Sequence, residues 1–244
     1  MKIIKVPRIN ALGLKGPEKA PDVILAGLGF DAGEIKVDNS NVQKSHEVIY
    51  QRAKEIFSEK EKVAFVGGDH SISAPILKGF GEVYGFENSF LIMFDAHADC
   101  MEPMQEPTHE ELFRSAIEYG FKPENVVLVG VRKIEPEEQK FLDENKVKIF
   151  LGTGNLEETG DYLTEKIKGK DVYVSVDMDV LNPSVVEGVN VPEENGMSEK
   201  GLFSLLEKVL PVAKAIDVVE VVPEKDVDGK TVEIAVKILS RFVG

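Results

Sequence analysis

The sequence predicts a doubly wound α/β fold, a three-layer α/β/α sandwich around a mostly parallel sheet of about eight strands. Two observations lead to this fold class. Short apolar runs rich in β-branched residues recur along the 244 residues, and amphipathic stretches of helical period separate them. Near-continuous hydrophobicity is typical of strands buried on both faces of a parallel sheet. Alternation of such strands with helices favours right-handed βαβ units.

The expected elements follow one another in a regular order. Strands are predicted at 2–6, 22–29, 62–68, 89–96, 125–132, 147–152, 171–177 and 215–222. Helices are predicted at 42–58, 110–119, 135–145, 156–168, 198–209 and 230–242, the fifth with Ser198 as its N-cap. No internal repeat and no linker rich in Pro, Gly or Ser divides the chain, so we expect one catalytic domain over residues 1–244.

The composition restricts the class of partner. The 43 acidic and 29 basic side chains give a formal net charge of −14. Nucleic acids and anionic membranes are polyanions, so this balance argues against both and suits a small cationic substrate. Cys100 is the single cysteine, which leaves no intramolecular disulfide. The first ten residues hold no signal-peptide core, and no run of eighteen apolar residues occurs, so we expect a cytoplasmic protein.

Ionisable side chains gather where three of the predicted strands end. The segments are "GGDHSIS" (67–73), "FDAHADC" (94–100) and "SVDMDVLNP" (175–183). Side chains two apart on an extended segment project to the same side, and ligands of open α/β sheets bind outside the carboxyl ends of the strands. We therefore expect six side chains to converge there: His70, Asp95, His97, Asp99, Asp177 and Asp179.

Four carboxylates packed together repel one another unless a counter-charge is present, and two divalent cations would balance them. Taken one at a time, these residues could simply cap turns, or in the case of His70 make a structural hydrogen bond. Their joint occurrence on three strand ends favours a metal site. A ligand set of oxygen and nitrogen without thiolate favours Mn²⁺ over structural zinc, and two bridged ions turn a shared water into a hydroxide nucleophile.

The three segments resemble, in order, the signature motifs of the ureohydrolase (arginase/agmatinase) family of binuclear manganese hydrolases. The similarity extends over nearly the whole chain, including "NALGLKGPEKAPDVI" near the start and "VVEVVPEKDVDGKTVEIAVKIL" near the end. The resemblance implies an arginase-like fold and two Mn²⁺ ions per chain.

The resemblance also implies a division of the six metal ligands, all of which carry the residue types of the family. His70 and Asp99 would bind one ion, and His97 and Asp179 the other. Asp95 and Asp177 would bridge the pair. A complete set implies a competent metal site.

Two further positions match the family and would act on the substrate. In "EPTHEELFRSA", His109 matches the catalytic histidine, which would donate a proton to the leaving amine. Glu220 matches the strand-end glutamate that contacts the guanidinium through a paired, charge-assisted hydrogen bond. The implied reaction is attack of the metal-bridging hydroxide on the guanidinium carbon, with release of urea and an amine. Asp69 and Ser71 are expected to hold the His70 loop in place.

Departures from the family concern the substrate more than the metals. Met101 stands where arginases hold the amino-acid head group with an asparagine, which argues against arginine. Glu135 and Glu138 resemble the acidic pair that meets a distal amine of the substrate, although they also read as a solvated helix start. Asn182 replaces the usual aspartate of the third motif. Agmatine is therefore favoured, with arginine as the second candidate.

Three other readings remain open. The first is a hydrolase of the same family that acts on a formimino, amidino or acyl-amine compound. The second is a metal-binding protein without catalysis, although the presence of His109 with all six ligand types argues against it. The third is a thiol role for Cys100, disfavoured because the adjacent Asp99 raises a thiol pKa and no CxxC partner exists. By family analogy we expect a homo-oligomer, a trimer or hexamer.

Overall fold

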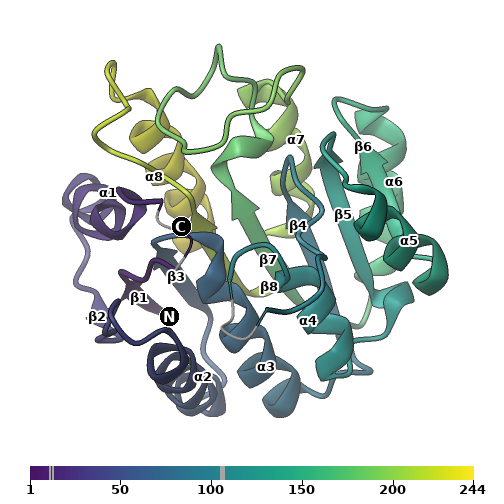
Figure 1. Ribbon diagram of the computed structural model, residues 1–244, viewed down its shortest axis with the longest axis horizontal. Coiled ribbons are helices and arrows are strands. Elements are labelled where there is room, and N and C mark those ends of the chain that lie inside the picture. The colour runs from purple at the N-terminus through teal and green to yellow at the C-terminus, as the bar shows by residue number, and fades with distance from the viewer. Residues whose placement is uncertain (11, 13, 105–107) are drawn as a thin grey trace.

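The computed structural model describes residues 1–10, 12, 14–104 and 108–244 (Figure 1). Within them, eight parallel strands form one sheet in the order β2-β1-β3-β8-β7-β4-β5-β6. The strands are β1 (Lys2–Val6), β2 (Gly33–Glu34), β3 (Val63–Gly67), β4 (Ser89–Phe94), β5 (Val126–Val131), β6 (Lys148–Leu151), β7 (Asp171–Asp177) and β8 (Ala213–Val219). The predicted fold class is therefore confirmed.

Helices cover both faces of the sheet. They are α1 (Ala20–Leu28), α2 (Val42–Ser58), α3 (Ser73–Tyr84), α4 (Leu112–Tyr119), α5 (Pro136–Asn145), α6 (Leu156–Lys166), α7 (Glu199–Val209) and α8 (Lys230–Val243). Apolar residues of α1, α6, α7 and α8 pack on one face, and those of α2, α3, α4 and α5 on the other. Ser198 caps α7 by accepting a hydrogen bond from the Gly201 backbone, as predicted. No helix of the described residues is long and apolar enough to cross a membrane.

The central strands are buried on both sides, and successive side chains enter different cores. In β4, Phe90 and Ile92 belong to the core beneath α7 and α8, whereas Leu91 and Met93 belong to the core beneath α3 and α4. All six residues of β4 are buried. This two-sided burial explains why the strand sequences are almost continuously apolar rather than alternating.

One predicted strand is wrong. Residues 22–29 lie within and just after helix α1. The apolar run "VILAGL" resembles a buried strand in composition, but only one side of it is covered: Ile24 is fully buried and Val23 is 41% exposed. Pro21 in the first turn and Gly29 at φ 68° after the last are a helix start and stop that the composition concealed. The sequence reading also left out helix α3 and the two-residue strand β2.

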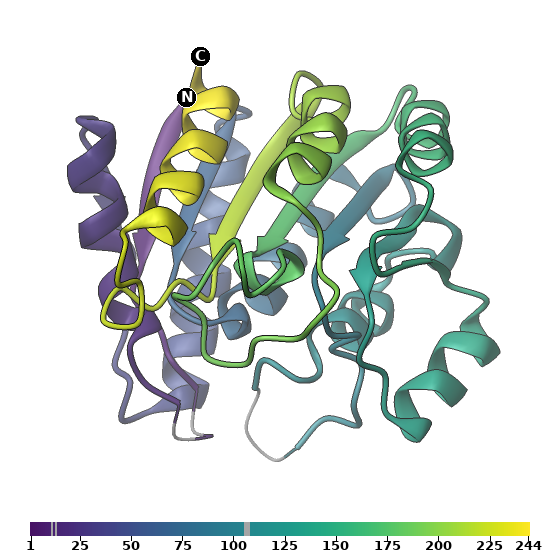
Figure 2. The same cartoon turned by 90° about the horizontal axis from the view of Figure 1, so that it is seen from above.

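The sheet order brings the chemistry-bearing loops together. Strands β3, β8, β7 and β4 are consecutive neighbours, and all run in the same direction. The loops that follow them therefore gather at one edge, seen where the arrowheads end in Figure 2. The chain leaves β1 for β2 toward one edge of the sheet and leaves β4 for β5 toward the other, and ligands of open α/β sheets bind where the connections change direction in this way.

Candidate metal centre and active site

The loop after β3 is shaped by a glycine that has no room for a side chain. A Cβ on Gly68 would lie 1.9 Å from the carbonyl oxygen of Arg8. The Asp69 backbone donates to that same oxygen at 3.0 Å. Asp69 then caps the short 3₁₀ helix His70–Ile72, accepting a hydrogen bond from the Ser71 backbone at 3.2 Å. This confirms the predicted capping role and holds His70 at the end of the strand.

Three of the four aspartates use one oxygen to fix the backbone of a neighbouring loop. Asp95 Oδ1 accepts from the His97 backbone at 2.6 Å, and Asp177 Oδ1 from the Asp179 backbone at 2.8 Å. Asp179 Oδ1 accepts from Ala96 N at 3.0 Å and so joins the loop after β7 to the loop after β4. The capping that a single motif suggested is therefore present, and it leaves the second oxygen of each carboxylate for another role.

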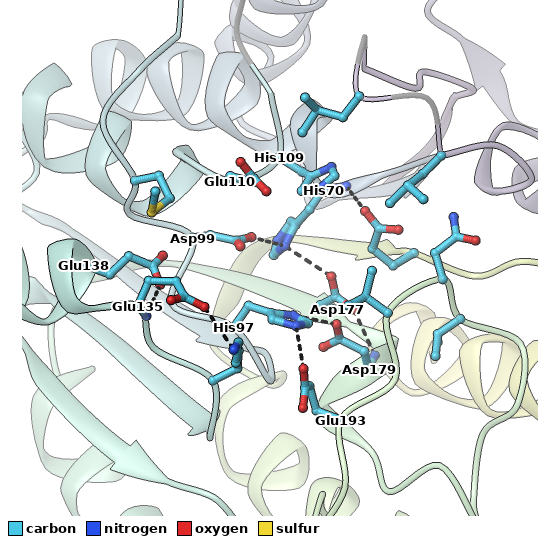
Figure 3. Close-up of a pocket in the computed structure, with 18 residues that line it drawn as sticks. His70, His97, Asp99, His109, Glu110, Glu135, Glu138, Asp177, Asp179 and Glu193 are labelled. Atoms are coloured by element: carbon cyan, nitrogen blue, oxygen red, sulfur yellow. Dashed lines mark hydrogen bonds and ion pairs between the residues drawn. The ribbon is translucent and has the colours of Figure 1, made fainter.

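Oxygens of these aspartates and of Asp99 approach two imidazoles, and Figure 3 draws the contacts of Asp99 and Asp177 with His70 and of Asp179 with His97. His70 Nδ1 lies 3.0 Å from Asp95 Oδ2, 3.2 Å from Asp99 Oδ2 and 3.3 Å from Asp177 Oδ2. His97 Nδ1 lies 2.8 Å from Asp179 Oδ2 and 3.5 Å from Asp95 Oδ1. The ligating atoms form two groups that could each hold an ion, His70 with Asp95 and Asp177, and His97 with Asp95 and Asp179. Asp95 belongs to both groups.

The residues present fit a pair of cations. Asp95 Oδ2, His70 Nδ1 and His97 Nε2 are buried and have no hydrogen-bond partner among the described residues. His70 Nδ1 and Asp95 Oδ2 are close, yet the contact lacks hydrogen-bond geometry. Buried polar atoms are rarely left in this state, and the cost is removed when a metal takes their lone pairs.

The pKa values of the clustered aspartates and of His97 also indicate that the cluster is stabilised by positive charge. Burial raises the pKa of Asp177 well above its usual range, and the adjacent Asp179 and Asp95 raise it further. Burial, followed by the charge of Asp95, raises the pKa of Asp99 to about 6. Burial lowers the pKa of His97, but Asp179 and Asp95 outweigh it and raise the pKa to about 12. Without a metal, protons must neutralise this cluster.

The far side of the His70 ring is held by a relay of buried hydroxyl groups. His70 Nε2 is 2.8 Å from Ser175 Oγ, and Ser175 Oγ donates to Asp217 Oδ1 at 2.6 Å. The other oxygen of Asp217 accepts from Tyr173 and Ser73 at 2.6 and 2.7 Å. Such partners orient a ligating imidazole and fix which nitrogen is available to the metal.

Glu220 follows β8 and lines the cavity beside the expected metal ligands. Its backbone has φ 63°, an uncommon conformation for this residue type, and its N–H donates to Gly68 at 2.9 Å. Its Oε1 accepts from the His70 backbone at 2.8 Å. Burial, and then the charge of Asp69, raise the pKa of Glu220 well above its usual range. A cation beside it would remove that penalty.

His109 lines the same cavity, and its Nδ1 is hydrogen-bonded to the side-chain amide of Asn10. Asn10 is in turn held by its backbone, which donates to Asp69 Oδ2 at 2.6 Å. Asn10 thus connects the histidine expected to move a proton with the loop that carries His70.

Glu135 and Glu138 both line the cavity, but they differ in what they contact. Glu138 Oε1 accepts from the Cys100 backbone at 3.0 Å and Oε2 from the Glu135 backbone at 2.9 Å, so both oxygens serve the fold. Glu135 caps helix α5 and pairs with Lys133 at 2.9 Å. A substrate contact by Glu138 stays a prediction, and it would have to share oxygens that already accept backbone hydrogen bonds.

The cavity above the cluster has a volume of about 530 Å³, in the range of small-molecule sites. His70, His97, Asp99, Asp177, Asp179, His109, Glu135, Glu138 and Glu220 are among its lining residues. Asp95 is fully buried beneath them. Every side chain that the sequence singled out for the site therefore lies in or directly under one cavity.

The sequence profile described as the Arginase family matches residues 22–244. The chain belongs to the arginase family. It is thus a hydrolase of the enzyme family that acts on amidino carbon–nitrogen bonds, and the family is metal-dependent.

Individual relatives have different substrates in their names. The agmatinase of Halalkalibacterium halodurans is 30% identical over 83% of this chain and 70% of its own. The arginase of Bacillus caldovelox is 32% identical over 73% of this chain and 67% of its own. The formimidoylglutamase of Bacillus subtilis superposes with a TM-score of 0.89 at 23% identity, covering 99% of this chain and 85% of its own, which shows a common fold.

Several residues of the site were missed by the sequence reading. Ser175 and Asp217 carried a detectable signal, because each is a polar residue inside an apolar strand. Asn10, Glu193 and Arg132 carried none. Glu193 approaches His97 Nε2 at 3.7 Å, and Arg132 donates to the carbonyl oxygens of Asp179 and Glu193 at 2.7 and 2.8 Å. Part of the segment "EPMQEP", residues 105–107, lies outside the described residues.

Proposed function

We propose that this protein is a manganese-dependent hydrolase that cleaves a small cationic guanidino compound into urea and an amine, with agmatine favoured over arginine. The observation that carries the proposal is the arrangement of two potential metal groups that share Asp95, placed beside the half-buried carboxylate of Glu220 in one cavity. Two like groups with a common carboxylate suit a pair of ions, and Glu220 suits the charge and shape of a guanidinium.

His70, Asp95, His97, Asp99, Asp177 and Asp179 would hold two Mn²⁺ ions. When bound, the ions supply Lewis-acid chemistry that activates water for attack at the guanidinium carbon. Oxygen-rich sites with imidazole and without thiolate suit this metal. The division of ligands taken from the family assigns Asp177 to both ions, and we retain it as part of the proposal.

The side chains of this chain orient the substrate. Glu220 Oε1 is fixed by the His70 backbone, so the carboxylate presents a set direction to the guanidinium. A planar carboxylate and a planar guanidinium pair through two charge-assisted hydrogen bonds. This contact places the electrophilic carbon over the cluster, because Glu220 and the metal ligands line the same cavity.

His109 would move the proton. Cleavage breaks the bond between the guanidinium carbon and the substituted nitrogen, and that nitrogen needs a proton before it leaves as an amine. An imidazole is suited to this role near neutral pH. Asn10 holds the ring from the Nδ1 side, and donation by its amide to Nδ1 would leave the ring proton on Nε2 for transfer.

The identity of the substrate rests on chemistry beside the cluster. Met101 lines the cavity and offers no hydrogen bond to an α-carboxylate, which favours a decarboxylated compound such as agmatine. A formimino or other amidino compound, or an acyl-amine, is the alternative within the same fold. A catalytically silent metal-binding protein is the alternative outside enzymology. As in the sequence reading, we infer one catalytic domain, a cytoplasmic location and a trimer or hexamer from the family.

The test is turnover by the Mn²⁺-loaded protein of agmatine, arginine and a formimino compound, with urea, formamide and free acid measured separately. We expect urea from agmatine, and loss of activity when the metal is removed. Full activity in metal-free protein would overturn the proposal. Release of formamide or free acid without urea would overturn the guanidino proposal and support the alternative hydrolase.

His109→Ala should lower turnover by about 10²- to 10⁴-fold, the usual contribution of a general acid, while both metals stay bound. Steady-state kinetics and metal content measured on the same preparation check this. His46→Gln is the matched control, since His46 is the histidine on helix α2 outside the cavity. Unchanged turnover in His109→Ala would remove His109 from the mechanism.

A further inference from the structure

One wall of the cavity is apolar. Leu12, Leu14, Met101, Val189 and Val191 line it together with the charged groups described above. The guanidinium end of a substrate needs the carboxylate and the metals, but it has no use for these five side chains. They are suited to the remainder of the molecule.

Four of these five side chains, all but Met101, come from two segments that lie against each other. The Asn190 side chain, between Val189 and Val191, donates to the carbonyl oxygen of Lys15 at 3.4 Å, next to Leu14. The Val189 backbone is itself held, since its N–H donates to Glu187 at 3.0 Å and its carbonyl accepts from Lys225 at 3.4 Å. The apolar side chains are therefore presented by an anchored part of the loop.

Several of these side chains remain open to solvent. Leu12 is 39% exposed, Leu14 36% and Val191 42%. A single exposed apolar residue is ordinary, but several that line one concave site mark a place where apolar surface of a ligand is buried. The cavity volume of about 530 Å³ is also larger than a guanidinium group alone requires.

The charges of the other lining residues exclude one kind of substituent. Glu110, Glu193 and Glu220 all face the cavity, whereas the lining lysine of the described residues, Lys133, is paired with Glu135 at 2.9 Å. A carboxylate on the substrate would be repelled by these three glutamates and would find Lys133 already paired with Glu135. Repulsion of this kind discriminates as strongly as attraction.

We propose that the cavity selects guanidines that carry an extended apolar N-substituent and no carboxylate, the N-alkylguanidines being the simplest such class. This inference rests on the proposed function and specifies its substrate class. Agmatine fits the class through its four-methylene stem, and arginine is excluded by its carboxylate.

The experiment compares n-propyl-, n-butyl-, n-pentyl- and n-hexylguanidine with 4-guanidinobutyrate, using the Mn²⁺-loaded protein and urea release. Each buried methylene should raise kcat/KM about three- to fourfold, the value expected for transfer of a CH₂ group out of water. 4-Guanidinobutyrate should fall at least about tenfold below n-butylguanidine, which has the same number of chain carbons.

Val191→Thr and Leu14→Asn replace apolar wall atoms with polar ones at nearly constant size. Each should reduce kcat/KM for n-hexylguanidine about threefold or more and reduce the value for n-propylguanidine by a smaller factor, so that the chain-length dependence flattens. Val227→Thr is the control, because Val227 is 86% exposed and does not line the cavity. It should match the wild type with every substrate.

The possible outcomes separate the two proposals. Urea from agmatine with no rise along the alkyl series overturns the substrate class alone, as does equal turnover of 4-guanidinobutyrate and n-butylguanidine. The substrate class is also overturned if Val191→Thr and Leu14→Asn both keep the chain-length dependence of the wild type. Absence of urea from every guanidine overturns the proposed function together with this inference.

Discussion

Individual side chains at this site have two partners of different kinds. Asp95, Asp177 and Asp179 each cap a backbone N–H with one oxygen and leave the other for the cluster. His70 divides its ring nitrogens in the same way, with Nε2 on Ser175 and Nδ1 toward the carboxylates. The folding of the loops and the assembly of the metal ligands thus depend on the same residues, and neither can be altered alone.

Ser175→Ala tests the relay behind His70. Loss of the hydroxyl removes the partner of His70 Nε2 and one of three hydroxyl donors to Asp217. We expect Mn²⁺ affinity to fall about 10- to 100-fold, the usual effect of losing such a partner, and titration calorimetry measures it. Ser89→Ala is the control, because Ser89 is equally buried but lies at the opposite end of a strand. Equal affinity in the two variants would show that the relay does not support the metal.

Individual site residues could be predicted from the sequence where they recur at a regular spacing within one motif. The alternation in "DAHAD" predicted that Asp95, His97 and Asp99 would lie close together, and the structure places Asp95 within 3.5 Å of both imidazoles and Asp99 beside His70. The segment is not extended throughout, since Asp99 has φ 46°, so spacing alone did not determine where its side chain lies. Asn10 could not be found in this way, since its contact with His109 joins segments 99 residues apart and depends on the sheet order. The φ of 63° at Glu220 likewise follows from tertiary contacts that no local pattern encodes.

At the scale of secondary-structure elements, the turn from β3 into the 3₁₀ helix His70–Ile72 controls the site. It depends on close approach between Gly68 and the Arg8 backbone, which links the loop after β3 to the end of β1. Because backbone cannot move aside as a flexible side chain can, any side chain at this position must displace the loop and the imidazole it carries.

Gly68→Ala should therefore lose Mn²⁺ binding. A Cβ 1.9 Å from the Arg8 oxygen forces a shift of the loop, and His70 shifts with it. Gly85→Ala is the comparison, since Gly85 at φ 88° meets no atom within 4 Å and lies beyond the other end of helix α3. It should cost about 1 kcal/mol of unfolding free energy and keep the metal. Metal content and urea unfolding measure the two effects, and full metal occupancy in Gly68→Ala would contradict the argument.

Helix α2 carries a histidine that makes stability depend on pH. Burial, with the positive charges of Arg8 and Lys78, lowers the pKa of His46 to about 3. The unfolded chain binds a proton at about pH 6.5, whereas the folded chain stays neutral, so stability is lost as the pH falls from about 6.5 toward 3.

His46→Gln removes this titration. Relative to the wild type, the variant should gain unfolding free energy as the pH falls from 7 to 5, by up to about 1.4 kcal/mol per pH unit below the unfolded pKa. Urea unfolding of both proteins in the metal-free state measures it, because the metal ligands then titrate equally in the two. A difference that does not vary with pH would mean that His46 takes up its proton over the same pH range in the folded and the unfolded chain.

The elements themselves were predictable where a single period dominated. Helix α2 has the bounds expected from the sequence, Val42–Ser58, because one buried stripe and an Asn41 N-cap define it. Residues 22–29 were misread because an exposed side of α1 is also apolar, which removes the helical period that marks a one-sided surface. The apolar run of α3 after the "GGDH" turn was passed over for a different reason: most of its first nine residues are buried, Ala74, Ile76 and Leu77 among them, so no polar face marks the helical period.

For the whole molecule, the sheet order decides where negative charge accumulates. Strands β3, β8, β7 and β4 deliver the six expected ligands and Glu220 to one edge, and seven ionisable side chains there share a small volume. The sheet is stable in itself, with two cores on its faces, so it can hold a cluster that is unfavourable without cations. Metal binding and folding stability must then be coupled, since ions that bind only the folded chain stabilise it.

Asp177→Asn should separate the stability of the metal-free fold from the stabilisation that metal binding adds. The amide keeps the oxygen that accepts from the Asp179 backbone, so the turn after β7 is retained. The folded-state pKa of Asp177 is raised well above its unfolded value by burial and by Asp179 and Asp95, so ionisation destabilises the metal-free fold above the unfolded pKa. At pH 8 the metal-free variant should therefore be more stable than the metal-free wild type.

With Mn²⁺ bound, the wild type should instead be more stable than Asp177→Asn. The wild type gains about 2.7 kcal/mol of unfolding free energy at an ion concentration of 100 times Kd, and the variant gains less because one ligand is weakened. Thermal unfolding of the wild type and of Asp177→Asn, each with chelator and with Mn²⁺, measures the four stabilities. Asp171→Asn, at the first residue of the same strand, should follow the wild type in both conditions. A metal-free Asp177→Asn that melts below the metal-free wild type would show that the carboxylates do not repel one another, and the cluster would then need no cations.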